Sequence, residues 1–138
     1  MHILRIEAIA GSFESLCQGF TPIVCLWMKI VYNKIIPFGR RYYAINLFGI
    51  LFAKGPLDRV STNHELIHSA QMKEMLYLPF YIAYVAEWLW KLIIYRHSYE
   101  AYACISFERE AYANQSDLSY LSNRRKWAFT KYLRKPNK

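Results

Sequence analysis

Two histidines four residues apart, with a glutamate directly after the first, stand in the stretch TNHELIHSAQMKE at residues 62–74. On an α-helix His64 and His68 share one face, so both imidazoles can reach one metal ion. Glu65 follows His64 by roughly 100° of rotation, which places its carboxylate beside that ion. Zinc suits imidazole ligands and lowers the pKa of bound water towards about 7, and a carboxylate can take that proton. The spacing indicates a zinc hydrolase site; an amphipathic helix with two incidental histidines is the alternative.

A catalytic zinc site needs a third protein ligand. His97 is one candidate, and the downstream carboxylates are the others, above all those of SFEREAYANQ at residues 106–115. Glu108 and Glu110 are two residues apart, so a helix points them in nearly opposite directions and at most one faces the metal. Glu108 lies on the more apolar face, and Ala111, one turn later, permits close packing on the motif helix.

HELIH, followed about forty residues later by a helical E-x-E-A, resembles the gluzincin branch of the zincin metallopeptidases, which includes thermolysin-like enzymes and the compact minigluzincins. The resemblance covers roughly residues 42–115, in motif and order. It implies that His64 and His68 bind one zinc ion per chain together with a glutamate on a later helix. It also implies that Glu65 is the general base of peptide-bond hydrolysis.

The family often reads E-x-x-A-D, with the first glutamate on zinc. Aligned on Ala111, the ligand is Glu108, and Tyr112 stands where the family has an acid. Aligned on Ala113, the ligand is Glu110, and Asn114 takes that place. We predict Glu108 as the third ligand and keep Glu110 as the alternate.

The resemblance also implies a histidine or tyrosine that stabilises the oxyanion, and His97 and Tyr102 are the candidates. Gln71 and Glu74 follow His68 at helical spacing and can orient the histidines from behind. In small zincins a strand precedes the motif helix and pairs with an extended substrate. AINLFGILFAK, residues 44–54, stands in that position and favours a peptide or protein substrate.

The local patterns predict a mainly helical α+β fold, a zincin-like domain with a short β-strand region before the HExxH helix. Aromatic and branched residues at 42–54 predict one or two strands, with Gly49 as a turn or bulge. Gly55 to Asp58 form a turn that opens a helix, and Asp117 or Ser116 is the predicted N-cap of the last helix. The helices are expected at 13–34, 58–75, 80–95, 99–115 and beyond 117, with a break at 35–41.

A chain of 138 residues fits a single domain, 1–138. Within it we expect a metallopeptidase core at about 42–115, an N-terminal helical segment at 1–41 and a basic C-terminal helix or tail at 116–138.

Two apolar segments bear on membrane association. Residues 75–95 are long enough to cross a bilayer, but Glu87 and Lys91 lie inside, and charges within a span are costly unless paired. A buried or interfacial helix is equally consistent. Residues 20–36 are interrupted by Lys29 and Lys34, which favours an amphipathic helix resting on a core or on a bilayer surface.

The net charge is +8, and after Asp117 the chain has seven basic residues and no acidic one. A basic end beside aromatic residues can face anionic lipid, nucleic acid or water. No nucleic-acid-binding motif accompanies it, so we expect no nucleic-acid partner and keep peripheral association with an anionic membrane as a possibility. The three cysteines imply no disulfide scaffold, and the N-terminal apolar run is short and broken by Arg5 and Glu7, so a cytoplasmic location is expected.

The sequence therefore predicts a zinc metallopeptidase in which Glu65 is the general base. One alternative is a non-enzymatic, membrane-associated helical protein, which would hold no metal. The other is a zinc-dependent hydrolase of a non-peptide bond, because the same activated water can attack other acyl centres.

Overall fold

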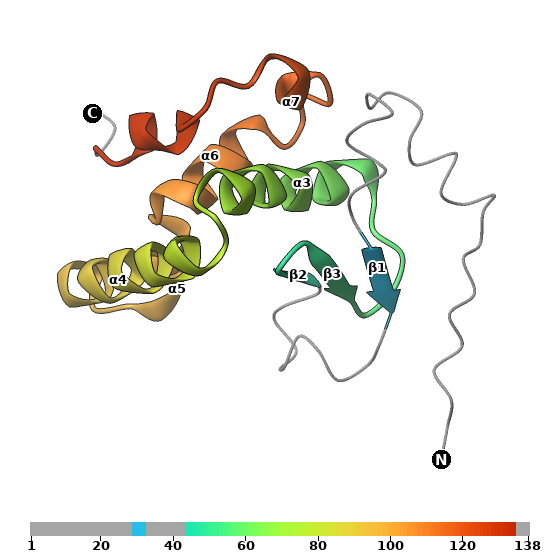
Figure 1. Cartoon of the computed structure of the whole chain (residues 1–138). Coiled ribbons are helices and arrows are strands. Elements are labelled where there is room, and N and C mark those ends of the chain that lie inside the picture. The colour runs from blue at the N-terminus through green and yellow to red at the C-terminus, as the bar shows by residue number, and fades with distance from the viewer. Residues whose placement is uncertain (1–28, 33–43, 135–138) are drawn as a thin grey trace.

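The computed structural model describes residues 29–32 and 44–134. They form a mainly helical α+β fold with one small sheet, in which α3 lies along the sheet and α4 and α5 extend away from it (Figure 1). The elements are β1 (Lys29–Tyr32), β2 (Ala44–Leu47), β3 (Ile50–Ala53), α3 (Arg59–Glu74), α4 (Leu78–Tyr95), α5 (Ser98–Ala103), α6 (Ser106–Asn114), α7 (Tyr120–Asn123) and the 3-10 turn η1 (Ala128–Tyr132).

The described strands form a sheet in the order β1-β3-β2. β1 runs parallel to β3, and β2 runs antiparallel to β3 with Asn46 opposite Leu51. Phe48 and Gly49, with φ of 53° and 80°, make the hairpin turn between β2 and β3. A positive φ costs glycine little, which explains the turn at this position. The two strands and the turn at Gly49 confirm the prediction of one or two strands at 42–54 with Gly49 as a turn or bulge.

α3 carries the histidine motif and confirms the helix predicted at 58–75. It begins where the Asp58 carboxylate accepts a hydrogen bond from the Ser61 amide at 2.6 Å, an N-cap that satisfies one free donor of the first turn. Leu66 turns towards the sheet and packs with Leu51 of β3. This contact fixes which face of α3 looks at the strands.

A second core lies where α3, α4, α6 and η1 meet. Phe107 of α6 is its centre, with ring centroids 4.9 Å from Phe80 of α4 and 4.4 Å from Phe129 of η1. Met72 and Ile105 complete the buried cluster. Because these apolar side chains come from four segments, burying them sets α6 against α3.

α4 confirms the helix predicted at 80–95 and begins slightly earlier, with Pro79 in its first turn, where proline is tolerated. Its two charged residues, Glu87 and Lys91, pair with each other at 3.9 Å on the inner side. Within the ranges 29–32 and 44–134, no helix is both long enough and apolar enough to cross a membrane.

The helix predicted at 13–34, and the amphipathic helix at 20–36, are wrong where the structure describes them. Residues 29–32 form strand β1, and residues 13–28 and 33–36 lie outside the described ranges. Ile30, Val31 and Tyr32 are branched and aromatic residues that favour strands, and they pair with β3 along its whole length. Pairing with a strand distant in the chain therefore overrides the local apolar pattern.

The single helix predicted at 99–115 is two helices, α5 and α6. The chain is extended at Ile105, with φ −60° and ψ 136°, and the Ile105 side chain is fully buried. The Glu87 carboxylate of α4 accepts hydrogen bonds from the Ser106 amide at 3.0 Å and the Ser106 hydroxyl at 2.6 Å. A carboxylate from another helix thus caps the start of α6, which compensates for the interrupted backbone hydrogen bonds.

The last predicted helix is reduced to the four residues of α7 and the 3-10 turn η1. Its N-cap residue is Ser119, so the prediction of Asp117 or Ser116 is wrong. Asp117 instead closes the preceding turn by accepting hydrogen bonds from the amide and hydroxyl of Ser119. Trp127 has a left-handed backbone and donates its amide to Glu74, which ends any continuous helix there.

Candidate metal centre

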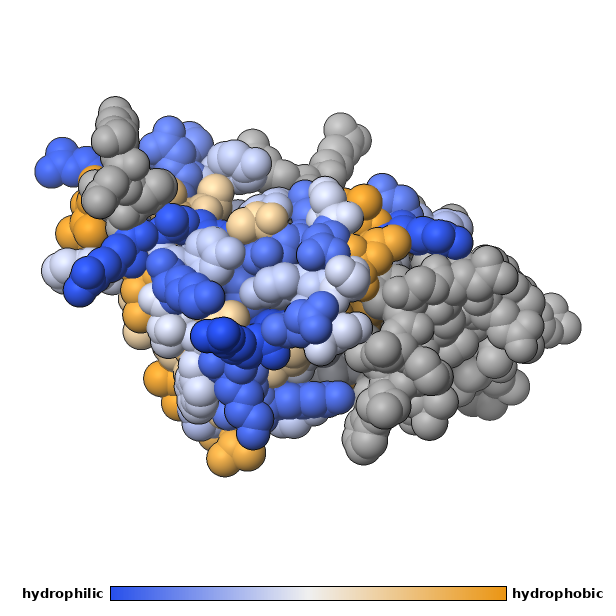
Figure 2. Space-filling model, turned by 90° about the horizontal axis from the view of Figure 1, so that it is seen from above, coloured by the Kyte–Doolittle hydropathy of each residue, from blue (hydrophilic) through white to orange (hydrophobic). Residues whose placement is uncertain are grey.

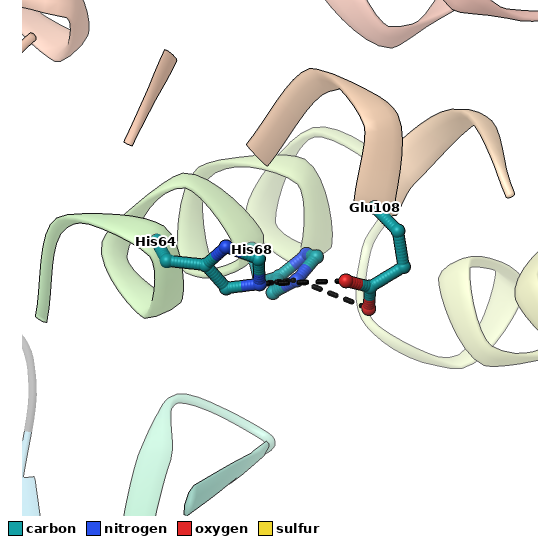
Figure 3. A group of neighbouring side chains, drawn as sticks. All are labelled: His64, His68 and Glu108. Atoms are coloured by element: carbon teal, nitrogen blue, oxygen red, sulfur yellow. Dashed lines mark hydrogen bonds and ion pairs between the residues drawn. The ribbon is translucent and has the colours of Figure 1, made fainter. Parts of the chain in front are cut away.

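Three buried side chains from two helices meet at the middle of α3. His64 and His68 come from α3 and Glu108 from the first turn of α6, and their ring nitrogens and carboxylate point at one another (Figure 3). The two Nε2 atoms are 3.1 Å apart. Glu108 Oε2 lies 3.4 Å from Nε2 of His64, and Oε1 lies 3.3 Å from Nε2 of His68. The helical spacing of the motif thus brings both imidazoles to one point, with Glu108 opposite them.

Two side chains, one small and one hydrogen-bonding, explain why α6 packs closely on α3. Ala111 is fully buried, and its small side chain permits the approach expected from the sequence. The fully buried Asn63 side chain donates hydrogen bonds to the main-chain oxygens of Gln115 at 2.9 Å and Asp117 at 3.0 Å. The residue just before His64 therefore fastens the end of α6 to α3 and fixes the helix that carries Glu108.

The far nitrogen of each imidazole faces an amide oxygen. Nδ1 of His68 is 2.8 Å from Oε1 of Gln71, and Nδ1 of His64 is 3.1 Å from Oε1 of Gln115. The orientation of the Gln71 amide is fixed, because its nitrogen donates to the Phe107 carbonyl and to Glu110. An amide oxygen only accepts, so Nδ1 of each histidine donates its proton there, and Nε2 of the neutral ring turns a lone pair towards the cluster.

This cluster fits a metal ion. Two Nε2 lone pairs 3.1 Å apart repel unless a cation lies between them. Oε2 of Glu108 is buried and accepts no hydrogen bond. Tetrahedral zinc with ligands at about 2.0–2.2 Å has neighbouring ligand atoms about 3.4 Å apart, close to the spacings between His64, His68 and Glu108. Two imidazoles and one carboxylate are also a ligand set that zinc takes in hydrolases.

Without metal, a proton occupies the same place. Burial works to lower the pKa of His68, but the Glu108 carboxylate outweighs it and raises that pKa to about 9. Burial works to raise the pKa of Glu108, but the charge of His68 and the hydrogen bonds from His68 and Tyr84 hold that pKa well below its usual range. In the metal-free cluster, protonated His68 therefore forms an ion pair with Glu108, and a metal ion must displace that proton in order to bind.

Glu110, the alternate third ligand, does not reach the cluster. It is fully buried on the opposite side of α6, where it accepts hydrogen bonds from Gln71 at 3.0 Å, Tyr120 at 3.0 Å and the Arg124 guanidinium. Glu74 also pairs with Arg124 and lies away from both histidines. Of the two side chains expected behind the histidines, Gln71 orients His68 and Glu74 does not.

Glu65 lines a cavity of about 460 Å³ together with the three cluster residues. Burial raises its pKa, although the neighbouring histidines oppose the change. Four lining residues, Ala44–Leu47, form all of β2, and the others are Met72 of α3, three aromatic residues of α4 and one residue of α5. The Asn46 side chain donates to the Glu65 carbonyl at 3.0 Å and to the Ser69 hydroxyl at 2.7 Å, which holds β2 beside the motif.

Of the two residues predicted to stabilise the oxyanion, one lies in the cavity wall and the other lies outside it. Tyr102 of α5 lines the cavity, and burial raises its pKa, so the hydroxyl keeps its proton. His97 is exposed where α4 passes into α5, and the cavity lining does not include it. The α4–α5 turn carries His97 outward, so the structure supports neither a catalytic nor a ligand role for this residue.

The sequence did not reveal three side chains that shape the site: Tyr84, Gln115 and Asn46. The Tyr84 hydroxyl donates to Oε1 of Glu108 at 2.7 Å. Gln115 shares the helical face of Glu108, so its position beside His64 could have been inferred from the spacing. Tyr84 had no such signal, because its helix reaches Glu108 only through tertiary packing.

Comparison with protein-family models, with curated proteins and with solved structures finds no match to this chain.

Proposed function

We propose that this protein is a zinc-dependent metallopeptidase of gluzincin type. One observation carries the proposal: His64, His68 and Glu108 form a buried ligand set beside a cavity that also holds Glu65. Zinc bound there would supply a Lewis acid and an acidified water. The resemblance of HELIH and the later E-x-E-A to the gluzincins supports the same reading.

Glu65 is the proton carrier of this mechanism. Its carboxylate lies in the cavity wall, and burial raises its pKa, which makes it a stronger base than an exposed glutamate. It takes the proton of the attacking water on a carboxylate oxygen and gives it to the leaving amine. Tyr102, which keeps its hydroxyl proton, donates a hydrogen bond to the developing oxyanion.

The position of β2 supports an extended peptide as the substrate. β2 is an outer strand of the described sheet, and all four of its residues line the cavity. A peptide that pairs with this strand is held by main-chain hydrogen bonds, so its scissile carbonyl lies next to Glu65. Asn46 keeps the strand at a fixed distance from α3.

A second candidate is hydrolysis of a non-peptide acyl bond. The cavity is lined largely by apolar and aromatic residues, including Met72, Phe80 and Tyr81, and such a surface admits an acyl chain as readily as a peptide side chain. The ligand set and the role of Glu65 would be the same.

The test combines metal content with turnover. We expect about one zinc per chain by elemental analysis in the parent and none in His64→Ala/His68→Ala. Glu65→Gln should keep its zinc and lose cleavage of a peptide library by about a hundredfold or more. Glu100→Gln, which removes an exposed carboxylate of α5, is the matched control and should cleave like the parent.

Loss of zinc in Glu65→Gln would make Glu65 a ligand and contradict the mechanism. Zinc with no peptide cleavage, but with hydrolysis of acyl esters, would favour the second candidate. No metal in the parent after zinc is added back would favour the non-enzymatic alternative.

A further inference from the structure

The outer face of α4 is apolar from end to end. The helix has nine exposed residues, and none of them is charged or polar: Leu78, Pro79, Ile82, Val85, Ala86, Leu89, Trp90, Ile93 and Ile94. We call this surface the α4 ridge. Trp90 and Ile93 expose 63% and 70% of their surface, although side chains of this kind are usually buried. The face shown in Figure 2, by contrast, is mainly hydrophilic, and its hydrophobic residues lie mostly towards the edges.

The width of the ridge distinguishes between kinds of partner. At about 100° per residue, the nine positions spread over roughly 180° of the helix circumference. A single partner helix covers a stripe of about 100°. A half-cylinder of apolar side chains instead matches a helix that lies in the boundary between headgroups and acyl chains, with its apolar half in lipid.

The charges around the ridge favour an anionic surface. Between residues 76 and 97 the only exposed residues that are not apolar are Arg96 and His97, at the end of α4. The one acid of the helix, Glu87, is turned inward to Ser106 and Lys91. The ridge can thus enter lipid without desolvating a carboxylate of α4 itself, while Arg96 and a net charge of +8 attract anionic headgroups.

The apolar surface continues to the cavity. Phe48, at the tip of the β2–β3 hairpin, exposes 61% of its surface, and its ring lies 4.9 Å from that of Tyr81. Its amide donates to the Tyr81 hydroxyl at 2.8 Å, and Tyr81 lines the cavity. The first turns of α4 therefore contact the hairpin tip, form part of the cavity wall and carry the beginning of the ridge.

We propose that the α4 ridge docks this protein onto an anionic phospholipid bilayer. The ridge lies in the headgroup–acyl boundary, Phe48 enters beside it, and the cavity opens next to the membrane surface. Docking does not depend on metal or turnover, so it can be tested apart from the proposed hydrolysis.

The experiment is vesicle flotation of the full chain. The probes are vesicles of phosphatidylcholine with about 30% phosphatidylglycerol, and vesicles of phosphatidylcholine alone. Ile82→Glu/Leu89→Glu/Ile93→Glu changes three exposed ridge positions. Ser122→Glu/Asn123→Glu/Thr130→Glu adds the same three charges at exposed positions elsewhere and is the matched control. Circular dichroism checks that both variants keep the parent fold.

We expect the parent to float with the anionic vesicles and to bind the neutral ones more weakly. The ridge variant should lose at least about thirtyfold in vesicle affinity, and the control should lose less than about threefold. Equal binding by parent and ridge variant, or no flotation of the parent, would overturn the proposal. A different partner is also tested, by light scattering without lipid. If neither protein floats, and the parent is a dimer while the ridge variant is a monomer, the ridge binds a second copy of the chain and the membrane proposal is overturned.

Discussion

Changing each of the two buried glutamates of α6 to glutamine should affect a different property of the protein. Glu108 faces the histidines, and Glu110 faces Arg124, although only one residue lies between them. Both exchanges keep the size of the side chain and remove one negative charge. We expect Glu108→Gln to lose zinc and Glu110→Gln to lose stability.

The magnitude for Glu110 follows from its partners. Its side chain is fully buried, and the Arg124 side chain is 4% exposed. Breaking a buried ion pair by removing one partner costs about 3–5 kcal/mol, and we expect the lower end, about 3 kcal/mol, because Arg124 keeps Glu74 as a second partner. In a chain of 138 residues that corresponds to a fall in Tm of roughly 10 °C. The fall should be the same with chelator and with zinc, because Glu110 does not touch the three cluster residues and a glutamine in its place can still accept the hydrogen bond from Gln71.

The magnitude for Glu108 follows from linkage. Zinc at about a thousand times its Kd stabilises the folded protein by about 4 kcal/mol. If the loss of Glu108 weakens zinc by about a hundredfold, the same zinc concentration gives only about 1.4 kcal/mol. The zinc-dependent rise in Tm should therefore shrink to about a third in Glu108→Gln.

The assay is thermal unfolding of the parent and both variants, once with chelator and once with saturating zinc. The reasoning would be refuted if Glu110→Gln abolished the zinc-dependent rise in Tm while Glu108→Gln kept it. In that case the third ligand would be Glu110, and α6 would be turned relative to the orientation described above.

Three further predictions concern smaller features. Gln115→Leu should weaken zinc by about 10–100-fold, because His64 loses the acceptor that orients it, while the metal-free Tm stays nearly constant; unchanged zinc affinity in a chelator competition would contradict this. The pKa of His68 is about 9 in the metal-free protein, so binding must release its proton, and zinc affinity should rise about tenfold per pH unit up to pH 9; equal affinities at about pH 7 and pH 8.5 would exclude that displacement. Asp58→Ala should cost about 1 kcal/mol of unfolding free energy by denaturant titration near pH 7. Because the hydrogen bonds from Ser61 lower the pKa of Asp58, this difference should disappear as the pH falls through that lowered pKa, and a difference that persists in acid would argue against the cap.

Much of the site could be predicted from the sequence because its signals are local. The spacing of His64 and His68 fixes their shared face on any helix. Glu108, which we placed on the more apolar face of its helix, is the glutamate that faces the two histidines. The hairpin could also be found, because Gly49 interrupts two runs of strand-forming residues.

Three of the failures share a different cause. Strand β1 depends on pairing with β3 about twenty residues later, and a local pattern holds no trace of that partner. The break at Ile105 depends on the Glu87 carboxylate from another helix. The contact between Tyr84 and Glu108 likewise depends on how α4 packs against α6. In these three cases a tertiary contact outweighed a local preference, whereas the N-cap error at Asp117 arose from a local turn with Ser119.

The ion pair between Glu110 and Arg124 also has a consequence for biosynthesis. A nascent chain made as far as residue 115 already contains His64, Glu65, His68 and Glu108, and so every residue of the proposed chemistry. It still lacks the guanidinium that neutralises the buried Glu110 beneath Gln71. Until Arg124 has been added, closing α6 onto α3 would bury the Glu110 carboxyl without its ion-pair partner, and either burying the charge or taking up a proton opposes closure. We therefore expect the metal cluster to assemble only after the chain past α7 has been made.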